Sequence, residues 1–158
     1  MAKRVTPEQF AIELGDLPER LEGAVIQGAR RAAMRLVVDV TQEIDTNKPY
    51  PVVDRGTLRQ SVQMESTPKG ANVFTAAPYA QVQERGSRPF WAPLAPLVAW
   101  ATRKGHDDPV GFARAVQASI AKNGIRPKWY FKRAVKKWWA RGTFKSEIGK
   151  ALERAKNR

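Results

Sequence analysis

The chain has 158 residues, of which 42% are hydrophobic and 27% charged, so its composition is that of a soluble globular protein and not of a disordered one. It contains no cysteine, which excludes disulfide bonds, thiolate metal sites and cysteine nucleophiles, and fits assembly in a reducing cytosol. The formal net charge of +13 predicts a polyanionic partner, an anionic surface or a place in a nucleoprotein assembly.

The charge is unevenly distributed along the chain. Residues 103–158 contain 16 Lys and Arg against four Asp and Glu, whereas residues 1–102 contain 12 against 11. No stretch approaches the ~18 apolar residues that span a bilayer, and Met1–Thr6 leads directly into polar sequence. We therefore expect no membrane span and no signal peptide, and we assign the basic character to the C-terminal third.

Helical patterns dominate the first 50 residues. Thr6 is a suitable N-cap and Pro7 suits the first helical position, but Gly15–Pro18 predicts an interruption. A longer amphipathic helix of roughly seven turns follows and is expected to end near residues 46–49. Its apolar and small residues recur at spacings of three or four: Leu21, Val25, Gly28, Ala32, Leu36, Val40 and Ile44. The small residues Gly28, Ala29, Ala32 and Ala33 permit close approach of the protein's own sheet or of another subunit.

The pattern changes to period two after a proline-rich loop. Residues 57–66 predict a strand, 67–70 a turn and 72–76 a returning strand. Residues 79–86 are expected to form a third short element packed on this hairpin.

The remainder is predicted to be helical. A short helix is expected from Leu94 to about Lys104, followed by a turn over residues 105–109. A second helix carries Phe112, Val116 and Ile120 and ends with Gly124 as its C-terminal cap, and a basic helix begins near Pro127. The sequence thus predicts an α+β fold in which a long N-terminal helix packs on a small antiparallel sheet, followed by short helices and a basic C-terminal helix. We expect one domain over residues 1–142 and a charged tail with helical periodicity over residues 143–158.

Catalytic chemistry is not indicated. His106, the one histidine, lies beside Asp107 and Asp108 in a predicted turn, and no nucleophile or metal-ligand spacing accompanies it. Asp54 and Glu84 could be a carboxylate pair, but a turn cap and a polar contact at the sheet edge explain them better. We therefore expect neither an enzyme nor a cofactor or metal site.

The basic helix allows three interpretations. Its aromatic side can be core and its basic side solvated, or the basic side can contact a DNA backbone, or the helix can lie at a membrane interface. The membrane alternative is the weakest because the rest of the chain gives no other membrane signal. The basic residues in question are Lys128, Lys132, Arg133, Lys136 and Lys137.

Four motifs carry a family resemblance by their order and spacing. They are Asp54-x-Gly56-x-Leu58-x-x-Ser61, Tyr79-Ala80-x-x-x-Glu84-x-Gly86, Pro93-Leu94-x-Pro96-Leu97-x-x-Trp100, and Ile120-Ala121-x-x-Gly124-Ile125-Arg126-Pro127. This ordered set resembles the tail-component, or tail-completion, family (minor tail protein Z-like) of long-tailed double-stranded DNA phages. The resemblance covers roughly residues 20–140, and the chain departs from the family pattern at Arg55 and Gln83.

The resemblance implies a non-enzymatic structural protein of the virion, located at the head–tail junction, or neck, or at the top of the tail. Such proteins form rings, often hexamers, around the channel through which DNA leaves. The implied partners are copies of the chain itself, other tail and neck proteins and double-stranded DNA. The implied locations are the virion and, during assembly, the host cytoplasm.

Within this hypothesis we expect two groups of contact residues. Subunit or partner contacts are expected at Asp54, Gly56, Leu58, Ser61, Tyr79, Glu84, Gly86, Arg88, Phe90 and Trp91. The basic residues expected to face the DNA channel or an acidic partner are Lys128, Lys132, Arg133, Lys136 and Lys137. The alternatives are a free protein that binds nucleic acid through non-specific phosphate contacts and a small basic toxin or nuclease.

Overall fold

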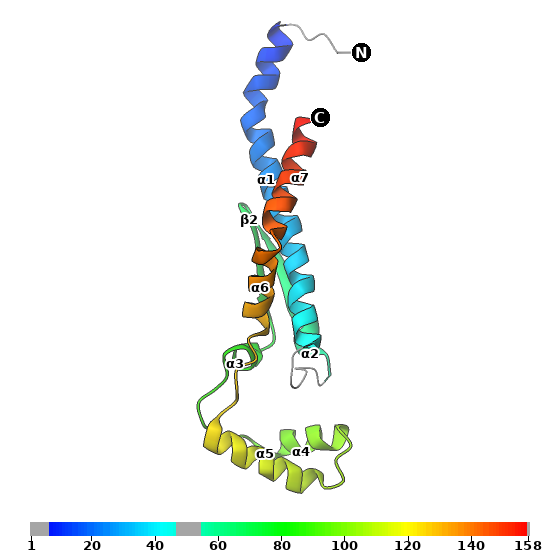
Figure 1. Ribbon diagram of the computed structural model, residues 1–158, viewed down its shortest axis with the longest axis vertical. Helices are drawn as coiled ribbons and strands as arrows, with labels where there is room; N and C mark the ends of the chain where they lie inside the picture. The colour runs from blue at the N-terminus through cyan, green and yellow to red at the C-terminus, as the bar shows by residue number, and fades with distance from the viewer. Residues whose placement is uncertain (1–6, 47–54, 158) are drawn as a thin grey trace. The chain divides into compact units, whose positions relative to one another are not determined.

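The predicted α+β class is confirmed. The computed structural model describes the backbone of residues 7–46 and 55–157 and the side chains of residues 18–46 and 55–157. Helix α1 (Pro7–Asp45) packs against a two-stranded antiparallel sheet and against the C-terminal helix α7 (Thr143–Lys156), and short helices make up most of the rest (Figure 1).

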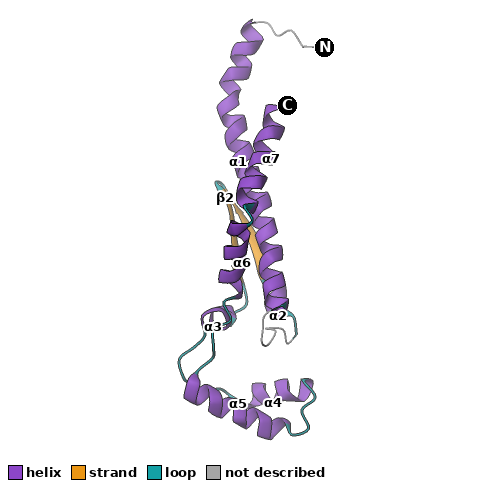
Figure 2. Cartoon of the chain, in the orientation of Figure 1, coloured by secondary structure: helices purple, strands orange, loops and turns teal. Residues whose placement is uncertain are grey.

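Helices far outnumber strands in the described part of the chain (Figure 2). The strands are β1 (Val62–Thr67) and β2 (Gly70–Thr75), joined by a tight turn at Pro68 and Lys69. The remaining helices are α2 (Thr57–Gln60), α3 (Ala80–Arg85), α4 (Leu94–Arg103), α5 (Pro109–Asn123) and α6 (Tyr130–Ala140).

The chain forms two compact units. The first contains the described residues of Met1–Asp39, Gln63–Phe74 and Val135–Arg158. The second contains those of Val40–Val62 and Thr75–Ala134. Each is described by itself below.

In the first unit, small residues allow α7 to approach α1 closely. A Cβ atom at Gly28 would lie 2.9 Å from the Cα of Ile148, so the two helices meet backbone to backbone at this point. Ala32 and Ala33 are buried on α1, and Trp138 donates a hydrogen bond from Nε1 to the carbonyl of Ala32 at 3.1 Å. Helix α7 therefore makes the close contact at Gly28, where the sequence analysis expected the protein's own sheet or another subunit.

Charged side chains also stabilise the first unit. The carboxylate of Glu147 accepts a hydrogen bond from Lys150 Nζ at 3.1 Å, and Arg31 lies 4.0 Å from it. The Lys150 hydrogen bond, opposed by burial and aided by the Lys150, Arg35 and Arg31 charges, holds the pKa of Glu147 below its ordinary value. The resulting stabilisation is present above the ordinary pKa and is lost as the pH falls through the lowered one.

In the second unit, α4 and α5 pack side by side (Figure 2). Aromatic side chains from both helices and from the loop between them contact one another. The His106 ring stacks on Phe112 at a centroid distance of 3.7 Å, and Trp100 completes the cluster. Asp108 caps α5 by accepting a hydrogen bond from the Gly111 amide at 2.9 Å. These contacts give His106 and Asp108 structural roles.

Two expectations about individual elements were wrong. Helix α1 continues through Pro18, because a proline inside a helix removes one hydrogen bond and need not end a helix held by packing elsewhere. The strand expected over residues 57–66 begins only at Val62, and its first part is helix α2. Helix α2 follows Gly56, whose φ of +78° starts the turn, and it buries Leu58. Thr6, residues 47–54 and the Asp54 of the first motif lie outside the described residues.

Candidate interaction surfaces

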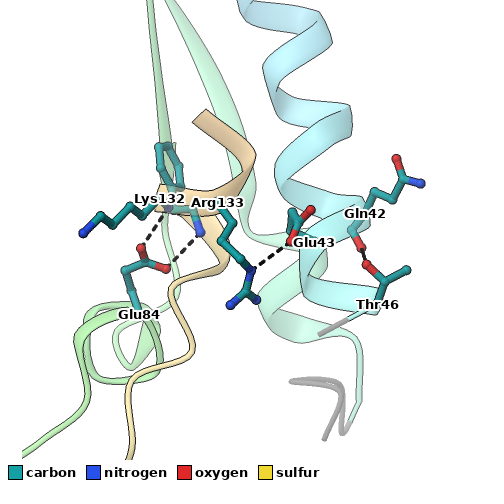
Figure 3. A network of polar contacts seen from close by, with 7 residues as sticks. Gln42, Glu43, Thr46, Glu84, Lys132 and Arg133 are labelled. Atoms are coloured by element: carbon teal, nitrogen blue, oxygen red, sulfur yellow. Dashed lines mark hydrogen bonds and ion pairs between the residues drawn. The ribbon is translucent and has the colours of Figure 1, made fainter. Parts of the chain in front are cut away.

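Glu84 ties helix α3 to the start of helix α6. Its two carboxylate oxygens accept hydrogen bonds from the amides of Phe131 at 2.9 Å and Lys132 at 3.0 Å (Figure 3). These amides belong to the first turn of α6, where backbone N–H groups lack partners within the helix and the helix dipole favours a negative charge. Glu84 is thus the N-terminal cap of α6, supplied from a residue 47 positions earlier.

A second polar contact joins α6 to the end of α1. Arg133 Nε donates to the carboxylate of Glu43 at 3.1 Å, and Glu43 is buried (Figure 3). Arg133 was expected to face a DNA channel or an acidic partner. Because its guanidinium neutralises a buried carboxylate, its first role is to hold this unit together.

We expect Glu84→Ala to lower the free energy of unfolding by about 2 kcal/mol, because two amides at the start of α6 lose a charged acceptor. Glu84→Gln should lose about 1 kcal/mol, since one amide oxygen remains but the charge is gone. Urea unfolding followed by circular dichroism measures both. Gln81→Ala, at an exposed position on the same helix, is the control and should leave the free energy of unfolding unchanged. If Glu84→Ala were as stable as the parent, the cap would make no contribution to the stability of the fold.

A groove of about 560 Å³ lies next to this cap, within the second unit. Trp129 forms part of its wall in a left-handed backbone conformation, with φ of +52°, which is unusual for a large side chain. The ammonium of Lys132 lies 4.9 Å from the centre of the Trp129 ring, within cation–π range. Burial raises the pKa of Tyr130, whose hydroxyl donates to the Ala80 carbonyl at 3.2 Å. The groove thus presents an aromatic wall beside a cation.

The loop between α3 and α4 carries the most exposed aromatic residue of the described chain. Trp91 is 72% exposed and Phe90 42% exposed, and Arg88 is exposed as well. Arg88, Phe90 and Trp91 were expected to contact a subunit or a partner, which requires that their side chains are accessible, and the structure meets that requirement.

The other motif residues lie in different environments. Leu58 is buried, Ser61 donates from its hydroxyl to the Leu58 carbonyl at 2.7 Å, and Tyr79 is exposed before α3. Gly56 and Gly86 both have positive φ, and a Cβ at Gly86 would collide with the Ile125 carbonyl. Among these residues only Tyr79 offers a large exposed side chain for a partner.

The predicted basic residues in α6 and just before it differ in their exposure. Lys132, Lys136 and Lys137 are exposed, whereas Lys128 and Arg133 are half-buried. The first turn of α6 belongs to the second unit, and the residues from Val135 onward belong to the first. Each unit therefore exposes at least one of these lysines, Lys132 on the second unit and Lys136 on the first.

Sequence reasoning missed two residues that shape these surfaces. Glu43 is charged, yet its side chain is buried next to the apolar Ile44. A charged residue at a buried position needs a partner, and this was the only signal for its pairing. Buried Gln117, on the inner face of α5, donates from its side chain to the Ala92 carbonyl at 2.6 Å. Its position between Ala113 and Ala121 on the apolar side of α5 was the available signal.

Among residues 18–46 and 55–157, whose side chains the structure describes, no group of three or more His, Asp or Glu is placed to hold a metal ion. In the same part of the chain no helix is both long and apolar enough to cross a bilayer.

Comparisons with known proteins give no match to this chain, whether with family models, curated proteins or solved structures.

Proposed function

We propose that this chain is a structural virion protein of a long-tailed double-stranded DNA phage. In this proposal it completes the top of the tail and joins it to the head, as one subunit of a ring around the DNA channel. The observation that carries the proposal is the surplus of Lys and Arg over Asp and Glu in the C-terminal third of a small α+β protein whose ordered motifs resemble the tail-completion family.

The basic surface is best seen in the first unit. Its C-terminal part, residues 135–158, contains only two acidic residues, and each is engaged by a base of the same unit. Glu147 is hydrogen-bonded to Lys150, and Glu153 to Lys156 at 3.3 Å. Lys136 and Lys145 are exposed on the same part of the chain. A surface with this surplus of cations attracts DNA phosphates or acidic protein faces.

The motif glycines support the resemblance because each has a conformational reason to be glycine. Gly56, Gly86 and Gly124 have φ values of +78°, +77° and +70°. Gly86 and Gly124 also lie against backbone atoms of the opposite segment. These positions preserve a particular backbone, as expected for motifs that specify a fold.

The alternative is a free protein that binds nucleic acid through non-specific phosphate contacts, and the same exposed lysines favour it. Retention on DNA cannot separate the two, since any protein of this charge binds a polyanion at low salt. Assembly separates them, because a ring subunit is required for particles and a free binding protein is not.

Deletion of the gene from its parent phage or prophage, followed by electron microscopy of the lysate, tests the proposal. We expect DNA-filled heads beside detached or aberrant tails, and normal virions when the gene is supplied on a plasmid. In the same assay, Lys136→Glu with Lys145→Glu should lower the infectious titre about tenfold or more, because attraction becomes repulsion. Ser146→Ala, an exposed neutral change on α7, should complement fully. Normal infectious virions without the gene would refute the proposal in favour of the alternative.

A further inference from the structure

We propose that the loop Arg88–Trp91 is a pre-organised docking element that inserts into an apolar recess on an acidic surface of a neighbouring protein in the particle. The inference rests on the proposed function and deepens it by naming the chemistry of one partner.

The exposed aromatic side chains make the loop a suitable anchor. Phe90 and Trp91 both present large apolar area to solvent, and exposed Arg88 precedes them by two and three residues. Trp and Arg are the residue types that most often dominate the binding energy of protein interfaces. None of the described residues of the second unit covers Trp91, so its indole is accessible to a partner.

Both ends of the loop are fixed. At one end, the Ser87 amide donates to the Ile125 carbonyl at 2.9 Å, and the Ile125 amide donates to the Ser87 hydroxyl at 3.1 Å. At the other end, Ala92 is buried and its carbonyl accepts the hydrogen bond from Gln117. Pro89 restricts the backbone between these anchors. Binding therefore costs little backbone entropy, which favours a docking role over a merely exposed loop.

The surroundings of the loop select an acidic partner. Between Arg85 and Ala134, all within the second unit, the sequence contains only two acidic residues, Asp107 and Asp108, and Asp108 is engaged as the cap of α5. Lys122 and Arg126 are exposed on the segment that pairs with Ser87, close in sequence to Ile125. A partner face that meets Arg88 and Arg126 must carry negative charge to avoid like-charge repulsion.

The same features favour a protein over nucleic acid. Cations alone suffice to bind a phosphate backbone, and the bases of duplex DNA are stacked on one another and offer no free face to an indole ring. An apolar recess on a protein can bury both Trp91 and Phe90, and acidic residues around that recess can pair with the arginines.

Site-specific photo-crosslinking tests the proposal in the assembled particle. The deletion phage is complemented with protein that carries p-benzoylphenylalanine at position 91, the particles are irradiated, and crosslinked peptides are identified by mass spectrometry. We expect one adduct, to a protein segment of net negative charge. Adding Arg88→Glu and Arg126→Glu should reduce its yield about tenfold or more. The same probe at position 119, where Ser119 is exposed on α5, should not label that segment.

Each result decides between the proposal and its rivals. An adduct to nucleic acid, an adduct to a neutral or basic segment, or no adduct in particles that contain the protein would overturn the docking inference and leave the proposed function standing. An unchanged yield after the two charge reversals, in variants with the parent's thermal melting curve, would also overturn it. Absence of the protein from the particles would refute both proposals.

Discussion

Gly124→Ala should lower the free energy of unfolding by about 4 kcal/mol, although the substitution only adds one methyl group. Gly124 has φ of +70° and ψ of −165°, a region that is essentially restricted to glycine. A Cβ at this position would also collide with the Ser87 carbonyl and lie 2.9 Å from the carbonyl carbon of Arg88. Backbone strain and a backbone clash therefore add, and urea unfolding measures their sum.

Gly105→Ala separates the two causes. Gly105 has φ of +75° in the same unit, but no atom lies within 4 Å of the position that its Cβ would take. We expect a loss of only about 1 kcal/mol, from backbone strain alone. Equal losses at the two positions would contradict the close packing of residues 87–88 against Gly124.

Gly28→Leu should cost about 3 kcal/mol, because α7 leaves no room for a side chain on this face of α1. The nearest atoms to a Cβ at position 28 are the Cα of Ile148 at 2.9 Å and the Glu147 carbonyl oxygen at 3.0 Å. Relief requires a shift of the α7 backbone, not of a flexible side chain. Thermal and urea unfolding should both show the loss.

The matched control is Gly23→Leu, five residues earlier on the same helix. No atom lies within 4 Å of its Cβ position, and leucine is a better helix former than glycine. We expect this variant to be as stable as the parent or slightly more stable. If both leucine variants were tolerated, the close approach of α1 and α7 would be wrong.

The elements that could be predicted are those with a strong local signal. The long apolar repeat of α1, the turn at Pro68 and Lys69, and the end of α5 at Gly124 were all expected, because period and turn chemistry are local properties. Helix α2 was missed because four residues are too few for a periodic pattern, and its start depends on the backbone conformation of Gly56.

The contacts at the candidate surfaces were less predictable because they join residues distant in sequence. Glu84 carries the cap of α6 from a different helix, whereas capping rules examine only the residues adjacent to a helix start. The pairing of Arg133 with Glu43 spans 90 positions and converts a predicted channel cation into an internal contact. The exposure of Trp91 depends equally on tertiary structure, since the sequence alone allowed it to be buried or exposed.

The hydrogen bonds beside Glu84 also bring together the two ends of a long excursion of the chain. The Lys128 amide donates to the Gln83 carbonyl at 2.9 Å and the Trp129 amide to the Glu84 carbonyl at 3.1 Å. The segment of residues 85–127 therefore begins and ends at the same place in the second unit. The entropy of closing such a segment grows only slowly with its length. Related chains could therefore carry an excursion of another length or another exposed tip on the same base. The proposed docking loop can in this way evolve separately from the base that holds α3 and α6 together.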